Sequence, residues 1–97
     1  MNLFSRKKRD ADEVQSGQFE LEQDGHVATL DYLLDSKALT LLETRVPDAL
    51  RGTGIARTLA MTALDWAREH GLKVDVICPF VFAFIHEHPE YADLVLK

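Results

Sequence analysis

The sequence lacks the features that mark secreted and membrane proteins. It has a single cysteine, Cys78, among 97 residues, so no internal disulfide can form and a disulfide-stapled extracellular domain is excluded. No apolar run approaches the roughly 20 residues that a transmembrane helix needs. The basic residues at 6–9 are not followed by the apolar core of a secretory signal. We therefore expect a cytoplasmic protein that does not enter a membrane.

Positive charge is also scarce. The chain carries 11 Lys and Arg against 16 Asp and Glu, which gives a net charge of −5. Four basic residues lie at 6–9, within residues 1–16, a segment without apolar periodicity that predicts a flexible arm. The predicted domain at 17–97 is therefore acidic and would repel a phosphate backbone, so we expect no nucleic-acid partner. Three of its basic residues are grouped around two glycines: Arg45, Arg51 and Arg57.

The remaining residues predict one α+β domain. Hydrophobic residues make up 46% of the chain and charged residues 28%, which is typical of a globular protein. Alternating apolar residues on both sides of the Asp24-Gly25 turn predict a hairpin from Phe19, with its second strand at 26–34. A third strand at 38–46 stops at Pro47, because proline lacks the N–H that a strand interior needs.

The second half of the chain predicts a helix, a strand and a shorter helix. Apolar residues recur at helical spacing from Ile55 to Trp66, and His70-Gly71 supplies a C-terminal cap. The strand at 73–77 should run parallel to the third strand, since a helix connects them. A last helix follows at 81–88. The predicted order is β-β-β-α-β-α, with a mixed sheet packed against helices.

A glycine loop precedes the longer helix and reads Arg51-Gly52-Thr53-Gly54-Ile55-Ala56-Arg57. The unpaired N–H groups at a helix start attract phosphate oxygens, and glycines allow a ligand to approach the backbone. The loop has neither the Gly-Lys-Ser/Thr of a P-loop nor the third glycine of a dinucleotide fingerprint. Its spacing alone leaves two interpretations open, a phosphate cradle or a tight turn with solvated arginines.

The loop and three later motifs together resemble the GCN5-related N-acetyltransferase family. Arg51, Gly54 and Ala56 match the acetyl-CoA loop Arg/Gln-x-x-Gly-x-Gly/Ala of that family. A small single-domain branch is similar over about residues 18 to 95, through its Ala67–Val74, Cys78–Phe80 and His88–Tyr91 motifs. The resemblance implies a minimal acetyl-CoA N-acyltransferase fold whose third and fourth strands splay apart.

The resemblance also implies acetyl-CoA, or coenzyme A, as the cofactor. The loop N–H groups would hold the pyrophosphate, and pantetheine would lie along the strand before the loop, where a backbone N–H would polarise the thioester carbonyl. The implied cofactor-binding residues are Thr44, Val46, Arg51, Gly52, Gly54, Ile55, Ala56 and Arg57. We expect no metal, because the sequence has no Cys/His cluster.

Three residues are candidates for the chemistry, each with a plainer alternative. Glu43 could accept the amine proton, or it is a surface carboxylate. Cys78, just before a helix start, could attack acetyl-CoA or form a mixed disulfide with coenzyme A, or it is a small buried hydrophobe. Tyr91 could protonate the coenzyme sulfur. His86 and His88 are interpreted as solvated or as partners of the helix dipole.

The predicted function is N-acetyl transfer from acetyl-CoA to an amine by direct attack. Full-sized family members carry two helices between their first strands, where this sequence has only turns. The acceptor side should therefore be open, which suits a protein amine as well as a small molecule. Two alternatives remain, a non-catalytic module that binds coenzyme A and a partner-binding protein. The sequence is compatible with a monomer or a homodimer.

Overall fold

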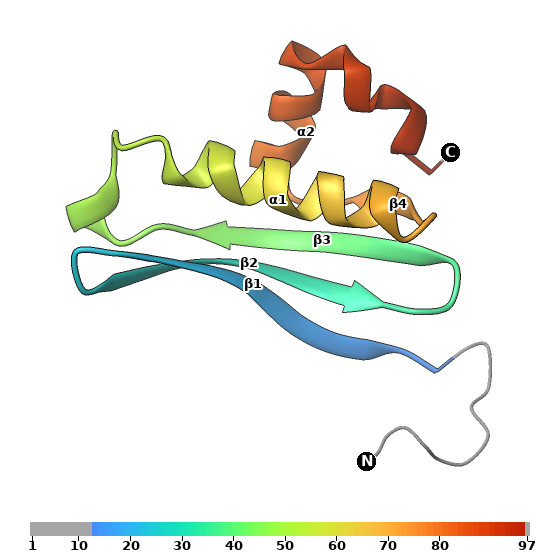
Figure 1. Cartoon of the computed structure of the whole chain (residues 1–97), viewed down its shortest axis with the longest axis horizontal. Coiled ribbons are helices and arrows are strands. Elements are labelled where there is room, and N and C mark those ends of the chain that lie inside the picture. The colour runs from blue at the N-terminus through green and yellow to red at the C-terminus, as the bar shows by residue number, and fades with distance from the viewer. Residues whose placement is uncertain (1–12, 97) are drawn as a thin grey trace.

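The computed structural model describes residues 13–96 and contains one four-stranded sheet (Figure 1). Its strands lie in chain order, β1-β2-β3-β4. The first three are antiparallel and the fourth is parallel to the third, as predicted. The strand bounds are β1 (Gln15–Gln23), β2 (His26–Leu34), β3 (Ala38–Arg45) and β4 (Lys73–Val76).

The helices lie on one face of this sheet (Figure 1). The two α-helices confirm the predicted order β-β-β-α-β-α, and two short 3-10 helices were not predicted. The bounds are η1 (Asp48–Leu50), α1 (Ile55–Glu69), α2 (Pro79–Glu87) and η2 (Pro89–Leu94). Helix α2 begins two residues earlier than predicted, because Pro79 itself serves as its first residue, where a missing N–H costs nothing.

The first strand also begins earlier than its sequence pattern indicates. Gln15 and Ser16 pair with Leu34 and Leu33 of β2, so both belong to the sheet, although the pattern assigns them to the arm. Residues 1–12 of the predicted arm lie outside the described residues. No helix among residues 13–96 is long and apolar enough to cross a membrane.

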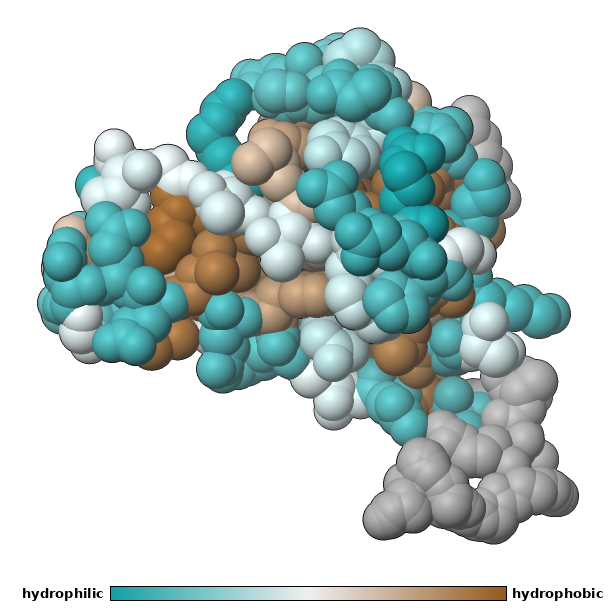
Figure 2. Space-filling view, viewed as in Figure 1, coloured by the Kyte–Doolittle hydropathy of each residue, from teal (hydrophilic) through white to brown (hydrophobic). Residues whose placement is uncertain are grey.

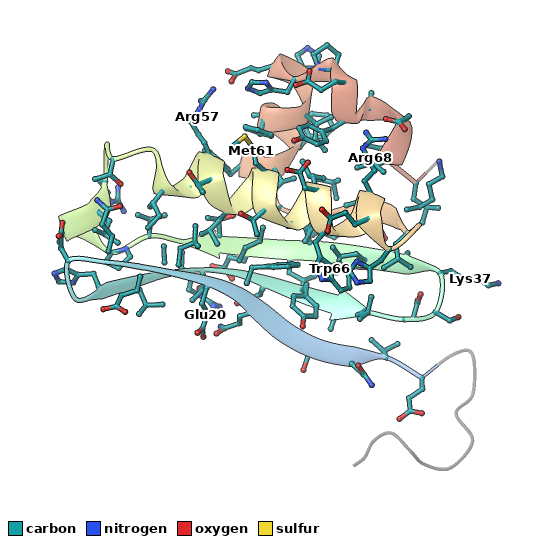
Figure 3. The ribbon with its side chains drawn as sticks, viewed as in Figure 1. Glu20, Lys37, Arg57, Met61, Trp66 and Arg68 are labelled. Carbon is teal, nitrogen blue, oxygen red and sulfur yellow. The ribbon has the colours of Figure 1, made fainter. Side chains whose placement is uncertain are left out.

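The core lies between α1 and the sheet face that it covers. Leu59 and Leu64 of α1 are fully buried, as are Leu30, Leu39 and Leu41 on the sheet. Such burial of leucine side chains stabilises a small domain by roughly 1.5–3 kcal/mol for each residue. Figure 3 shows the side chain of Trp66 directed from α1 toward the sheet, whereas Glu20 projects from the opposite side. We call this opposite side, which no described helix covers, the bare face.

Candidate functional site

A bulge in β3 decides which side chains face the helices. Asp31 of β2 pairs with Glu43 and the next residue, Tyr32, pairs with Leu41, so Leu42 is an extra residue in β3. Such a bulge interrupts the normal alternation of side chains along a strand. Leu41 is on the helix-covered face, but Glu43 lies with Asp31 on the bare face. Regular alternation would have placed Leu41 and Glu43 on the same face.

The bulge brings Thr44 to the helix-covered face. Thr44 pairs with the fully buried Leu30, and residues on directly opposed positions of a sheet share a face. The Thr44 hydroxyl oxygen lies 3.3 Å from the Cys78 sulfur, so these two side chains meet at the start of α2.

Strands β3 and β4 separate at the bulge. Their pairing ends at Leu41 and Val76. The N–H groups of Ile77 and Cys78 both donate to the Leu41 carbonyl oxygen, each at 2.9 Å, and the chain then turns into α2. Within the part of the chain that is described, no strand pairs with β3 on this side after Leu41. The divergence that the family resemblance implies is present.

The glycine loop leaves a row of backbone donors unpaired. Gly52 and Gly54 have positive φ angles of 80° and 85°, a conformation that other residues rarely adopt. The first helical bond of α1 runs from the Thr58 N–H to the Gly54 carbonyl at 3.1 Å, and no side chain caps the helix. Five N–H groups therefore donate to no acceptor among residues 13–96, those of Gly52, Gly54, Ile55, Ala56 and Arg57.

These donors border a groove with a volume of about 470 Å³ between the end of β3, the loop and the start of both α-helices. Figure 2 shows hydrophobic surface exposed beside the end of β3 and the start of α1. The groove is lined by Thr44, Val46, Leu50, Arg51, Gly52, Gly54, Ile55, Ala56, Arg57 and Phe80. The structure thus brings together all eight residues that the resemblance implies for cofactor binding.

The groove suits a long ligand that is anionic at one end and less polar along its length. The orphan N–H groups and the positive end of α1 favour phosphate oxygens, and Arg51 and Arg57 add charge. A Cβ atom on Gly52 or Gly54 would meet nothing within 4 Å, so the space beside both backbones is open. The pyrophosphate of coenzyme A fits this donor set, and the apolar wall fits pantetheine.

Leu50 and Phe80 were missed by the sequence analysis. Leu50 is buried in η1, a short helix that alternation and helical spacing do not reveal. Phe80 is 37% exposed and follows the helix-starting Pro79, so its place in the Cys-Pro-Phe motif was the available signal.

The structure does not bring Glu43 into the groove. Its carboxylate lies on the bare face and accepts a hydrogen bond from Arg45 at 3.2 Å, and Arg45 also donates to Asp31 at 2.7 Å. Glu43 can therefore act only on a group that approaches from that face.

Cys78 and Tyr91 do not line the groove either. The Cys78 side chain is 2% exposed and lies behind Thr44. The Tyr91 hydroxyl donates to Asp65 at 2.8 Å, and Asp65 lies ten residues beyond the start of α1, about 15 Å along the helix. Burial, followed by the bond to Asp65, raises the pKa of the Tyr91 phenol. Its burial and its bond to Asp65 indicate that Tyr91 holds η2 against α1.

No metal centre is evident in this part of the chain. Within residues 13–96, no three His, Cys, Asp or Glu side chains come together as a metal site requires.

The family model of the GCN5-related N-acetyltransferases matches residues 18–94. The chain belongs to this family. The match begins in β1 and ends in η2, so it includes the whole groove.

Relatives of this chain include the NATD1 proteins of vertebrates. NATD1 of Xenopus tropicalis is 42% identical over 53 residues, which cover 55% of this chain and 49% of that protein. NATD1 of Danio rerio is 39% identical over 62 residues, which cover 62% of this chain and 56% of that protein. The chain therefore spans about half the length of the curated relatives that it matches.

A solved structure supports the fold. A crystal structure of a protein from Agrobacterium tumefaciens, provisionally described as an acetyltransferase, superposes with a TM-score of 0.53 at 24% identity. The superposition covers 81% of this chain and 59% of that one.

Proposed function

We propose that this chain binds acetyl-CoA in the groove and transfers the acetyl group to an amine. The observation that carries the proposal is the row of five unpaired N–H groups from Gly52 to Arg57, which border one groove together with two arginines. Family membership supports the same conclusion.

The roles of the residues follow from their positions. The loop N–H groups hold the pyrophosphate, while Thr44 and Val46 form the wall along which pantetheine extends toward the divergence of β3 and β4. When bound, acetyl-CoA supplies a thioester that an amine can attack. The amine nitrogen forms a bond to the acetyl carbon, the carbon–sulfur bond breaks, and the coenzyme leaves as a thiolate that must be protonated.

Glu43 is our candidate for the group that accepts the amine proton. It is the only carboxylate on β3, and it lies two residues beyond the point where β3 and β4 separate. An acceptor that approaches from the bare face meets Glu43 on its way to the thioester. Because this face carries no described helix, it can admit a protein amine as well as a small one.

Direct transfer assigns no bond-forming step to Cys78. The sulfur is almost completely buried and faces the Thr44 hydroxyl, so an acetyl-cysteine intermediate would require the groove wall to open. Cys78→Ala should therefore retain turnover. Loss of turnover in a folded Cys78→Ala variant that still binds the coenzyme would favour the covalent route.

A second candidate is a coenzyme-binding module without transferase activity. It is favoured by one observation, namely that none of Glu43, Cys78 and Tyr91 lines the groove. Calorimetric titration with acetyl-CoA and with coenzyme A tests the binding that both candidates require, and we expect micromolar affinity, about −8 kcal/mol.

An acceptor screen then separates the two candidates. Small amines and lysine peptides are offered with acetyl-CoA, and release of coenzyme thiol is measured. The transferase proposal expects turnover that Glu43→Gln lowers by 10²–10⁴-fold, the usual contribution of a general base. Glu20→Gln is the matched control, because Glu20 also lies on the bare face but on the far strand β1. Binding without turnover on any acceptor would favour the module.

A further inference from the structure

Arg57 both lines the groove and contacts the end of α2. It lines the groove on the first turn of α1, and its Nη2 atom lies 3.5 Å from a Glu87 carboxylate oxygen near the end of α2. The same Nη2 atom lies 3.5 Å from Nε2 of His88. Figure 3 shows the Arg57 side chain leaving α1 on the side away from the sheet. A groove residue is thus held by a helix that contributes only Phe80 to the groove.

A buried ring supports this contact. Phe84 is 3% exposed, so its position is fixed by the core. The His88 ring stacks on Phe84 with centroids 4.3 Å apart and planes at 27°, and the Arg57 guanidinium lies 5.8 Å from the centroid of the same Phe84 ring. The side chains of Arg57 and His88 are therefore both positioned against one rigid surface, which lowers the entropy lost in bringing them together.

The hydrogen-bond roles around His88 follow from the chemistry of its neighbours. A guanidinium has donors only, so the Nε2 atom that faces Arg57 acts as an acceptor. The ring proton then lies on Nδ1, which is 3.5 Å from a Glu90 carboxylate oxygen. A chain of contacts thus runs from Glu90 through His88 to Arg57. Neutral His88 completes this chain, whereas protonated His88 would direct an N–H toward the guanidinium and repel it.

We propose that Glu87 and His88 are positioning residues that hold Arg57 against α2, and that protonation of His88 releases Arg57 to the coenzyme pyrophosphate. The proposal rests on coenzyme binding in the groove, as argued above. It makes coenzyme affinity dependent on pH through a residue that does not line the groove. Within the described residues, the charged groups recorded in contact with His88 are Arg57 from α1 and Glu90 from η2, and Glu87 of α2 contacts the same Arg57 guanidinium.

Protonation of His88 has two consequences, and both should strengthen coenzyme binding. Protonated His88 no longer accepts a bond from Arg57, and its own positive charge lies near the anion site. Coenzyme affinity should therefore rise as pH falls. By linkage, coenzyme binding should be accompanied by proton uptake. The Arg57 and Glu87 side chains are 53% and 61% exposed, so we expect a change of about threefold.

The test uses dephospho-coenzyme A, because the 3′-phosphate of coenzyme A is a monoester that itself titrates near pH 6. Affinity is measured by calorimetry between pH 5.5 and 8. Proton uptake is measured at pH 6.5 in two buffers of different ionisation enthalpy. We expect wild-type protein to bind about threefold more tightly at the lower pH, with uptake of a fraction of a proton. Glu87→Gln should bind about threefold more tightly than wild type at every pH and keep the pH dependence.

His88→Gln should abolish both the pH dependence and the proton uptake. His86→Gln is the matched control, because His86 lies in the last turn of α2, two residues before His88, but lines a separate apolar pocket, and it should behave like wild type. An unchanged pH dependence in His88→Gln would overturn the proposal, as would pH-independent binding by wild type, and either result would leave coenzyme binding intact. Absence of binding at every pH would overturn the proposed function as well.

Discussion

Replacement of Gly54 by valine separates the shape of the loop from its role in binding. Gly54 has a φ of 85°, and an added Cβ would meet nothing within 4 Å. Gly25, in the hairpin turn between β1 and β2, does not line the groove, and it has a φ of 81° and equally open space. Gly54→Val and Gly25→Val therefore impose nearly the same backbone strain at two sites, of which only one borders the groove.

The size of each effect follows from this geometry. The left-handed conformation costs an L-residue roughly 1–2 kcal/mol, and more when the side chain is β-branched. In a domain of this length, each kcal/mol lowers the melting temperature by about 4–8 °C. Both variants should lose similar stability. Only Gly54→Val should also place a branched side chain where the phosphate approaches. The steric block should cost one charge-assisted hydrogen bond to the phosphate, about 1.5–3 kcal/mol. Such a loss weakens binding by at least tenfold.

Calorimetric titration with coenzyme A measures the affinity, and thermal unfolding measures the stability. The expected result is at least a tenfold weaker affinity for Gly54→Val, with Gly25→Val binding like wild type despite a similar melting temperature. Wild-type affinity in a folded Gly54→Val variant would refute the placement of the pyrophosphate. Equal loss of affinity in both variants would show that global stability, rather than the loop, controls binding.

Three further predictions concern the fold. Leu59→Ala removes a fully buried side chain between α1 and the sheet and should lower the free energy of unfolding by about 2–5 kcal/mol, measured by denaturant titration. Gly17→Ala would bring its Cβ into the Tyr32 hydroxyl, so it should destabilise the protein, whereas the same change in a Tyr32→Leu background should cost much less. The hydrogen bond from Arg68 holds the pKa of Asp93 below its usual value, so the stabilisation is present above about pH 4 and is lost as pH falls through the folded-state pKa. The melting temperature of Asp93→Asn should therefore fall below that of wild type at pH 6 and approach it in acid.

Much of the fold could be predicted because local patterns agree with it. The second strand at 26–34 and the helix start at Ile55 were predicted correctly, since a strong turn and paired glycines mark them. The parallel direction of β4 followed from the helix that precedes it. The short helices η1 and η2 were missed because a 3-10 turn of a few residues leaves no periodicity.

The glycine loop could be predicted more fully than the candidate catalytic groups. Its donors are backbone N–H groups. Their position follows from the order of a strand, two glycines and a helix, which the sequence shows directly. Side-chain candidates depend on which face a residue occupies, and the bulge at Leu42 reverses that assignment for Glu43. The partner of Tyr91 is Asp65, 26 residues away along the chain, which no local pattern predicts.

The bulge also divides β3 into two segments with different roles, one before Leu42 and one after it. Residues before Leu42 pair with β4, and Leu39 and Leu41 among them pack in the core, whereas Thr44, after the bulge, lines the groove. If Leu42 were kept but the strand alternated regularly, without the bulge, the second segment would turn over, so that Glu43 would face the groove and Thr44 the bare face. Deletion of Leu42 would instead join the two segments in regular alternation and leave each side chain on its present face. In this strand, the geometry of the backbone at the bulge decides which side chains reach the groove as strictly as the identity of the residues does.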